Sequence, residues 1–247
     1  MKIPPTAAED LRLLARYDTP TICNVIELFD IRPRNTGYMD GRIRACFPEM
    51  PPIVGYASTA TFRAAFPKTE GTVYSSLDDQ VRAFSELPGP PIVVFQDLDD
   101  PPVAATFGEI MCASYQAFGA VGLITSGAAR DLDQVRRLGF ATFAGGVIAS
   151  HGYSQTLAIN ETVRVGGVAV RPGELLHADA NGVTTIPHEI ASEVAHAAEE
   201  YVAAEGVVLE FAKSGRRDLK LYSEAREETL RRIAELGKRV RARRAIA

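Results

Sequence analysis

The chain has 247 residues, of which 46% are hydrophobic and 23% are charged, and its formal net charge is -4 at pH 7. This length and composition predict a globular protein with a substantial hydrophobic core, in one large domain or two small ones, and exclude a disordered chain. The near balance of acidic and basic residues excludes the basic excess that is typical of nucleic-acid-binding proteins.

The cysteines and the amino-terminal residues indicate a compartment. Cys23, Cys46 and Cys112 have no CxxC spacing, and a chain of this length does not depend on disulfides for stability. The first residues lack the apolar core of a signal peptide, and no run of about 18 apolar residues could span a bilayer. We therefore expect a cytoplasmic protein with neither a membrane partner nor a nucleic-acid partner.

Helices are predicted at the start of the chain. Apolar residues recur at helical spacing over 7–17, and the Thr-Pro-Thr sequence at 19–21 could cap a second helix over 22–29. After a connection rich in proline and glycine, β-branched residues alternate over 53–64 and predict a strand. Residues 71–87 are typical of a helix, which ends at a Pro-Gly-Pro sequence.

The middle of the chain is predicted to form a strand, helix, strand unit. Residues 92–96 and 120–126 are short apolar runs, typical of strands buried on both faces, and 108–119 between them has helical spacing. A crossover of this kind is nearly always right-handed, and its two strands are parallel. Residues 141–146 could add a further strand.

The last third is predicted to contain antiparallel strands followed by helices. Residues 163–187 are rich in β-branched residues and contain turn sequences at Gly166-Gly167, Pro172-Gly173 and Asn181-Gly182. From about residue 187 the chain is helical and charged. Its basic tail could bind nucleic acid, but the interspersed glutamates favour a solvated helix face. We predict one α/β domain over 1–247, with a mixed sheet and helical amino- and carboxyl-terminal segments.

Residues 108–131 place charged side chains around an otherwise apolar run. The segment starts with Gly108 and Glu109 and closes with Arg130 and Asp131. Because buried charge is costly unless it is paired or binds something, this placement needs a cause. A helix followed by a returning parallel strand brings both ends to the carboxyl edge of the sheet, where open α/β sheets bind ligands.

The residue types at these two ends suit a small acid and a cation. Unpaired N–H groups at a helix start favour an anion, and Ile110 and Met111 would offer them. Arg130 matches a carboxylate, while Asp131 and Glu109 supply oxygen ligands for a divalent ion or its water shell. Together they predict a metal-assisted site for a 2-oxoacid. The alternative is an ion pair that merely ties a loop to a helix.

The same segment resembles a known family. GEIMCASYQAFGAVGLITSGAARD (108–131) and VRPGELLHADANGVTTIP (170–187) are similar to the 4-hydroxy-4-methyl-2-oxoglutarate / 4-carboxy-4-hydroxy-2-oxoadipate aldolases. That family also contains the regulator of ribonuclease activity A and proteins labelled demethylmenaquinone methyltransferase-like. The resemblance, from about residue 19 to about residue 222, implies a class II aldolase with Mg²⁺ or Mn²⁺. It also implies a three-layer β/β/α fold like the swivelling phosphohistidine domain, assembled as a homotrimer or homohexamer.

The resemblance further implies roles for individual residues. Asp131 would ligate the metal, and Glu109 would hold its waters. The pyruvyl group of the substrate would be bound by Gly108, Ile110, Met111 and Arg130. The family's site lies between subunits and takes an acid from the neighbour's carboxyl-terminal helix. By alignment this acid is Glu205, with Glu199, Glu200 and Glu210 close by. The helical segment 188–247 is accordingly expected to pack on a neighbouring subunit.

Such a site supports cleavage of the C3–C4 bond of a 4-hydroxy-2-oxoacid, which gives pyruvate and a second carbonyl compound. Negative charge develops on the pyruvate enolate, where a Lewis-acid metal and Arg130 can stabilise it. A base must take the C4 hydroxyl proton, and a water on the metal, oriented by Glu109, could do so. Oxaloacetate decarboxylation passes through the same enolate and is an expected side activity.

Two segments, 38–57 and 145–155, depart from the short members of the family. The second contains His151 and Tyr153, which could reach the far end of a substrate as a proton donor or a hydroxyl-binding group. We include His151 among the substrate-binding residues, although an ordinary loop histidine is the alternative. The departure argues against the usual dicarboxylic substrate.

His177 and Asp179 have the spacing of two metal ligands on one strand face. Since a third ligand is missing, a structural role at the end of a hairpin is favoured.

Two other functions stay open. A family member could regulate ribonuclease E by docking without catalysis. A related enzyme on the same metal platform could be a decarboxylase, hydratase or tautomerase of a sugar-derived oxoacid. The complete set of Glu109, Arg130 and Asp131 favours an enzyme, because a docking surface has no need of a metal ligand.

Overall fold

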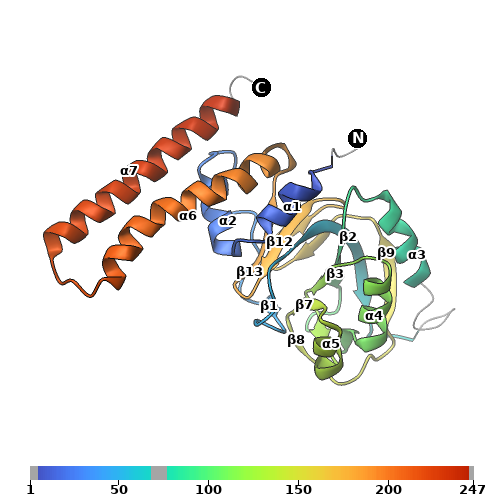
Figure 1. The fold of residues 1–247 in the computed structure, drawn as a ribbon. Coiled ribbons are helices and arrows are strands. Elements are labelled where there is room, and N and C mark those ends of the chain that lie inside the picture. Colours follow the sequence, from blue (N-terminus) through green and yellow to red (C-terminus); the bar gives the residue numbers. More distant parts are fainter. Residues whose placement is uncertain (1–4, 68–76, 245–247) are drawn as a thin grey trace.

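A main sheet of eight strands forms the centre of the computed structural model, which describes residues 5–67 and 77–244 (Figure 1). The strand order is β1-β7-β5-β3-β2-β12-β13, and β9 also pairs with β2. The strands are β1 (Arg44–Ala45), β2 (Ile53–Arg63), β3 (Pro91–Asp97), β5 (Gly122–Thr125), β7 (Ala141–Ala144), β9 (Gln155–Ile159), β12 (Leu175–Asp179) and β13 (Gly182–Ile186). The central strands β2, β3, β5 and β7 are parallel, and their other neighbours are antiparallel.

Two small sheets accompany the main one. The first has three short parallel strands in the order β4 (Ala105–Phe107), β6 (Ala128–Ala129) and β8 (Gly146–Val147). The second is a hairpin of β10 (Val163–Val165) and β11 (Val168–Val170). Its turn uses Gly166 and Gly167 at φ of 54° and 79°, as expected from the Gly-Gly sequence, because a side chain is strained at such angles.

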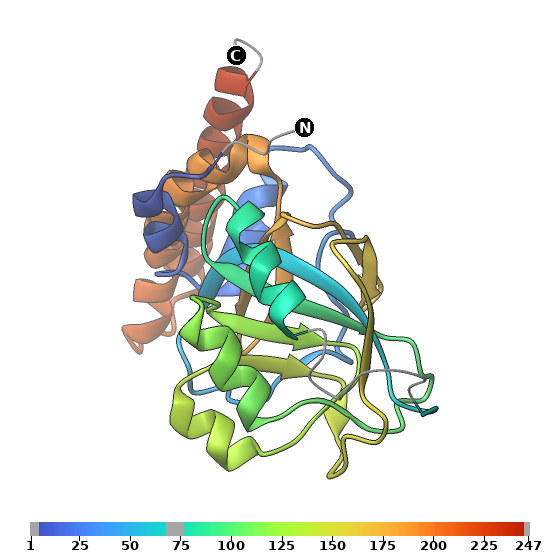
Figure 2. The same cartoon turned by 90° about the vertical axis from the view of Figure 1, so that its right-hand side faces the viewer.

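The helices lie at different places around the main sheet (Figures 1 and 2). Near β12 and β13 lie α1 (Ala8–Leu14), α2 (Thr19–Glu27) and α6 (Ala191–Lys213), and α7 (Leu219–Arg244) packs against α6 as an antiparallel hairpin. Near β3 and β5 lie α3 (Leu77–Ala83), α4 (Glu109–Ala117) and α5 (Leu132–Leu138). A short 3₁₀ helix at Phe84–Glu86 follows α3, and another at His188–Ile190 lies between β13 and α6. Within the described residues, no helix combines the length and apolarity needed to cross a membrane.

Alternation along β3 explains how the sheet is buried on both faces. Val93 and Phe95 pack in the cluster that contains α4 and α5. Ile92 and Val94 belong to the opposite cluster, which contains the β10–β11 hairpin. Because side chains alternate between faces, a continuous apolar run is what a strand covered on both sides requires.

Several predictions from the sequence are confirmed. The unit β3–α4–β5 has parallel strands, with Ile92 opposite Gly122. The chain after residue 187 is helical, and the hairpins β10–β11 and β12–β13 lie in the region predicted to be antiparallel. The structure is therefore a mixed α/β fold with helices at its carboxyl end.

Other predictions were wrong in detail. The cap of α2 is Asp18, whose Oδ1 accepts the N–H of Thr21 at 2.8 Å, since the Thr-Pro-Thr sequence forms the first turn itself. The last hairpin turns at residues 180 and 181, because Asp179 already pairs with Gly182. Residues 141–146 divide between β7 and β8. Of the predicted helix 71–87, residues 71–76 lie outside the described residues, and the α-helix covers Leu77–Ala83.

Candidate functional site

The small parallel sheet brings three loops together. Gly108 follows β4, Arg130 follows β6, and the loop that carries His151 follows β8. The N–H of Arg130 donates to the carbonyl of Phe107 at 3.2 Å, and that of Ile148 donates to Ala129 at 3.0 Å. The expectation that Glu109 and Arg130 meet at a carboxyl edge is thus met in the small sheet, not in the main sheet, because β4 and β6 follow the main strands and pair separately.

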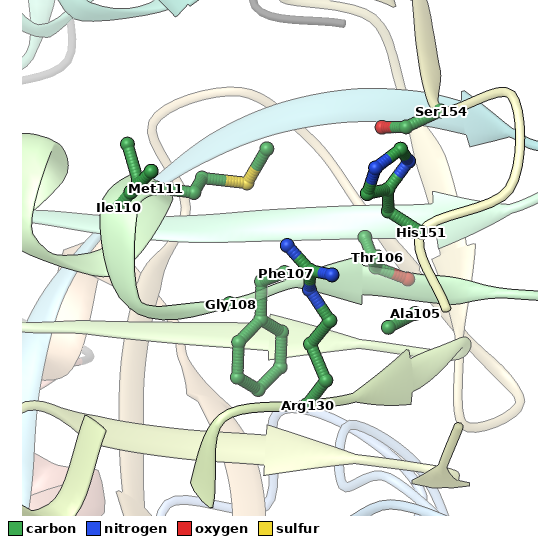
Figure 3. Close-up of a pocket in the computed structure, with 9 residues that line it drawn as sticks. All are labelled: Ala105, Thr106, Phe107, Gly108, Ile110, Met111, Arg130, His151 and Ser154. Carbon is green, nitrogen blue, oxygen red and sulfur yellow. The ribbon is translucent and has the colours of Figure 1, made fainter. Parts of the chain in front are cut away.

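A hollow of about 20 Å³ opens at this edge (Figure 3). We call it the hollow; it is lined by Ala105, Thr106, Phe107, Gly108, Ile110, Met111, Arg130, His151 and Ser154. The lining contains all five residues for which substrate binding was predicted, namely Gly108, Ile110, Met111, Arg130 and His151. The structure therefore brings together residues that are up to 43 positions apart in the chain.

Arg130 is the only permanently charged residue of this lining. Its side chain is 27% exposed, and its Nε lies 3.6 Å from Oδ2 of Asp131. Figure 3 shows the guanidinium extending into the hollow with Met111 and His151 above it. Because a guanidinium presents several N–H groups in one plane, Arg130 can bind a carboxylate with two parallel hydrogen bonds.

Asp131 is held against the start of α4. It adopts φ of 53°, in the left-handed region, as the residue that precedes α5. Its Oδ2 accepts the backbone N–H of Glu109 at 3.0 Å. Within the described residues, its other carboxylate oxygen has no hydrogen-bond donor, and one third of the side chain is exposed. Asp131 thus fixes the helix start with one oxygen and leaves the other for a ligand.

Gly108 allows this close approach. A Cβ at this position would collide with Oδ2 of Asp131 and would lie 2.9 Å from Nε of Arg130. The φ of Gly108 is -152°, which any residue can adopt, so the need for glycine comes from space and not from backbone strain. The absence of a side chain here permits the contact between Asp131 and the start of α4.

The first turn of α4 offers backbone N–H groups to the hollow. The first four N–H groups of a helix have no partner within it. Here Asp131 accepts that of Glu109, and Cys112 donates to the carbonyl of Gly108. Among the described residues, none accepts from Ile110 or Met111, so these two amides can bind an anion at the positive end of the helix dipole.

The acids near the hollow fit a hydrated divalent ion better than a fully protein-bound one. In the described residues there is no group of three or more His, Cys, Asp or Glu side chains that could hold a metal. Asp131 offers one free oxygen, and the exposed Glu109 stands at the start of α4. Mg²⁺ usually keeps several waters and takes one or two carboxylates, whereas zinc takes three or four protein ligands. The donor set therefore fits Mg²⁺ or Mn²⁺.

Glu205 lies elsewhere in the same chain. It is half-buried on α6, which Figure 1 shows on the far side of the main sheet from α4. Burial, followed by the charge of Glu205 and a hydrogen bond to it, raises the pKa of Tyr201 to about 12. Glu205 therefore does not reach the hollow of its own chain, and a role at a neighbour's site stays a prediction.

His177 and Asp179 have the structural role that the sequence favoured. The side chain of His177 is buried between Oγ1 of Thr19, 2.9 Å from Nδ1, and the carbonyl of Leu14, 3.2 Å from Nε2. Oδ2 of Asp179 accepts the N–H of Thr19 at 2.9 Å. Both side chains thus bind the start of α2 to β12, and burial lowers the pKa of His177.

Sequence reasoning missed two polar residues of the hollow, Thr106 and Ser154, and it favoured a polar loop for Asp97. Thr106 and Ser154 line the hollow, and both the hydroxyl of Thr106 and Oδ2 of Asp97 lie against Gly127, where Oδ2 is buried without a hydrogen-bond partner among the described residues. Burial raises the pKa of Asp97 to about 6. The aspartates Asp97, Asp99 and Asp100 end a predicted strand, where acids that support a metal site were the alternative to the favoured polar loop. Thr106 and Ser154 carried no signal of their own.

Comparison with known protein families gives a match over most of the chain. The model of the RraA-like family, described as Aldolase/RraA, matches residues 19–185. This range includes every lining residue of the hollow together with Glu109 and Asp131, and it ends before α6.

Two curated relatives match about two fifths of the chain. One, from Halalkalibacterium halodurans, is named "Putative 4-hydroxy-4-methyl-2-oxoglutarate aldolase" and is 35% identical over 101 residues. The match covers 40% of this chain and 47% of that protein. The other, protein DlpA of Legionella pneumophila, is 28% identical over 36% of this chain and 15% of its own length. The match thus spans less than half of either relative.

Solved structures share the fold over most of the chain. A protein from Pseudomonas syringae has a TM-score of 0.72 at 22% identity, covering 92% of this chain and 97% of that one. RraAS2 of Streptomyces coelicolor, titled an unusual member of the RNase ES inhibitor RraA protein family, has a TM-score of 0.64 at 22% identity. That match covers 86% of this chain and 99% of the other. At this identity the likeness shows the fold alone.

Proposed function

We propose that this chain, which belongs to the RraA-like family, is a divalent-metal-dependent (class II) lyase that cleaves a 4-hydroxy-2-oxoacid into pyruvate and a second carbonyl compound. The family description and the name of the Halalkalibacterium halodurans relative support the aldolase class. The observation that carries the proposal is the hollow itself. It joins the guanidinium of Arg130 and two free amides of α4, and the carboxylate of Asp131 lies beside that guanidinium, with Oδ2 3.6 Å from Nε of Arg130.

These groups match the pyruvyl part of such a substrate. Its carboxylate would bind Arg130 and the amides of Ile110 and Met111, all of which favour an anion. The ketone oxygen beside that carboxylate would then lie at the mouth of the hollow, near Asp131. Holding both oxygens fixes the plane of the 2-oxoacid, which positions its C3–C4 bond for cleavage.

The same groups act on the charge that cleavage creates. Electrons from the breaking bond move to the ketone oxygen of the pyruvate enolate, and the fixed positive charge of Arg130 stabilises them there. Phe107 and Met111 line the hollow with apolar surface and so exclude water. When bound by Asp131, with waters held by Glu109, a Mg²⁺ or Mn²⁺ ion supplies Lewis-acid stabilisation to the same oxygen. Oxaloacetate would lose CO₂ through the same enolate, as a side activity.

The assembly is part of the proposal. The helical segment 188–247 would pack on a neighbouring subunit of a homotrimer or homohexamer, and Glu205 would complete the neighbour's site. The projection of the α6–α7 hairpin away from the main sheet suits this role (Figure 1). The fold would then be the three-layer β/β/α arrangement of swivelling phosphohistidine domains over one domain, 1–247.

Pyruvate release tests the reaction. The purified full chain is incubated with 4-hydroxy-2-oxoacids or oxaloacetate, with Mg²⁺ or Mn²⁺ or with a chelator, and pyruvate is followed with lactate dehydrogenase. We expect release that requires the metal. No release from any substrate, together with inhibition of ribonuclease E by the same preparation, would replace the lyase by the regulator that the family description also names.

Two substitutions test the site. Asp131→Asn should lower kcat at least about 100-fold, because asparagine keeps the left-handed backbone but removes the charge. Asp133→Asn is the matched control, since its side chain is 80% exposed two residues further on. Arg130→Lys should lower kcat about 10- to 100-fold through the loss of bidentate binding. Normal metal-dependent turnover in Asp131→Asn would remove Asp131 from the site.

A further inference from the structure

His151 is the one lining residue of the hollow that can accept a proton near neutral pH. Five of the nine lining residues are glycine or apolar, and two carry hydroxyl groups, Thr106 and Ser154. The guanidinium of Arg130 stays protonated in proteins. Imidazole is the side chain that exchanges protons between pH 5 and 8. Any proton acceptor contributed by this lining is therefore His151.

The ring of His151 is oriented with one nitrogen free. Its Nδ1 lies 2.8 Å from the carbonyl oxygen of Gly152. Because a carbonyl oxygen only accepts hydrogen bonds, Nδ1 must carry the hydrogen, and the neutral ring then has its lone pair on Nε2. Figure 3 shows the imidazole at the edge of the hollow beside the hydroxyl of Ser154, above the guanidinium of Arg130.

The loop that carries His151 is tied to the strands on both sides. The carbonyl of Ser150 accepts the N–H of Ala105 in β4 at 2.8 Å. The carbonyl of His151 accepts the N–H of Ser154 at 3.1 Å, and Tyr153 donates to Ala64 after β2 at 3.1 Å. These bonds hold the imidazole over the hollow, although its own side chain is exposed. The position of His151 is thus fixed by backbone contacts.

We propose that His151 is the catalytic base that accepts the proton of the substrate's C4 hydroxyl, an assignment that rests on the proposed function. The proton moves from the hydroxyl oxygen to Nε2, and the electron pair of the O–H bond forms the C4 carbonyl. The C3–C4 bond breaks, and its electron pair becomes the pyruvate enolate. The same proton then passes from Nε2 to C3, which gives pyruvate and restores the neutral ring.

Asp131 does not compete for this role. Its Oδ2 accepts the N–H of Glu109 and lies 3.6 Å from Nε of Arg130, and Asp131 is not among the lining residues of the hollow. Arg130 is the charged group that faces His151 from the lining.

Two reactions of the same site distinguish proton removal by His151 from binding of the oxoacid. Aldol cleavage requires a base, since the C4 hydroxyl must lose its proton. Decarboxylation of oxaloacetate does not, because loss of CO₂ gives the enolate directly. Removal of His151 should therefore slow the first reaction much more than the second, whereas damage to the oxoacid-binding groups should slow both.

The test compares His151→Gln with the matched control His196→Gln in the full chain. His196 lies on α6, 68% exposed, with its Nε2 3.3 Å from Asp10. For His151→Gln we expect kcat of aldol cleavage to fall at least about 100-fold, with KM and oxaloacetate decarboxylation within about 3-fold of wild type. The fall of the wild-type cleavage rate toward acid pH should disappear in this variant. Added imidazole should restore part of the cleavage by His151→Ala.

The outcomes distinguish this assignment from the proposed function. A wild-type chain that releases no pyruvate overturns both. Active wild type with unchanged cleavage by His151→Gln overturns the base assignment alone. An equal loss in both reactions also overturns it, because His151 would then bind the oxoacid and not remove the proton.

Discussion

The hollow and the α6–α7 hairpin use charged residues differently. Around the hollow, Arg130 and Asp131 are partly buried, and a backbone N–H holds the acid in place. On α7, Glu228 pairs with Arg231 and Arg232 at 2.7 Å each, and these two arginines are about half exposed, at 56% and 48%. The hydrogen bond from Arg231, and next that from Arg232, lower the pKa of Glu228 to about 2.

The comparison shows that the position of a charged side chain matters more than the number of ion pairs. Exposed ion pairs are worth little individually, because water and salt screen them. A partly buried acid held by a backbone donor has one geometry, so a small displacement changes what it can bind. We therefore expect substitutions at the hollow to change the chemistry strongly, and substitutions on the hairpin to change mainly local stability.

The largest effect should come from Gly108→Ala. The added Cβ would collide with the Asp131 carboxylate and crowd Nε of Arg130 at 2.9 Å. We expect kcat/KM for pyruvate release to fall at least about 100-fold, while the free energy of unfolding falls by about 1–2 kcal/mol.

Gly146→Ala in β8 is the control for Gly108→Ala, since a Cβ there meets nothing within 4 Å. Its steady-state kinetics and its unfolding by urea should match those of wild type. Equal activity losses in both variants would contradict the collision argument.

A moderate effect is expected from Leu236→Ala on α7. Leu236 is 4% exposed and packs in the cluster that joins α1, α2 and α6. Its truncation should lower the free energy of unfolding by about 2–3 kcal/mol, measured by thermal or chemical unfolding.

Leu230→Ala, whose side chain is 55% exposed, should leave stability unchanged. The oligomeric state of both leucine variants, measured by light scattering, sharpens the comparison further. If the hairpin packs on a neighbouring subunit, the loss of Leu236 should weaken the assembly and its activity together.

The smallest effect should come from Asp97→Asn, which we expect to increase the stability of the fold in a pH-dependent way. Burial raises the pKa of Asp97 from 3.8 to about 6, so the folded state favours the protonated acid. Its contribution to stability is complete below pH 3.8 and is lost as the pH rises through about 6. Asparagine does not ionise, so the variant should be more stable at pH 8 by about 1 kcal/mol, discounted for partial exposure. A gain of equal size at pH 3.5 would contradict this explanation.

The sequence predicts those parts of the fold that have long periodic signals. The apolar runs of β3 and β5 and the helix between them gave the parallel unit, because burial on both faces leaves a continuous hydrophobic run. The small sheet escaped prediction, since β6 and β8 have two residues each and show no periodicity. Helix α5 was also missed, because it is a short and mostly polar helix that begins directly after Asp131.

The sequence predicted only part of the candidate site. The charged ends of 108–131 pointed to Arg130, Asp131 and the start of α4, which the structure brings together. Thr106 and Ser154 could not be predicted, because their positions depend on contacts between segments that lie far apart in the chain. The side chain of Glu109 is exposed outside the lining, and only its backbone N–H reaches Asp131.

The small parallel sheet has a dynamic consequence. Only a few interstrand hydrogen bonds, such as those donated by Arg130 and Ile148, join the strands that present the three loops. Segments with so little local protection open more readily than a central strand such as β3, so the amides of Arg130 and Ile148 should exchange with deuterium before those of Val93 and Val94. A bound 2-oxoacid would reduce this difference in exchange rate. Slower exchange at Arg130 would therefore report binding even where no turnover is seen.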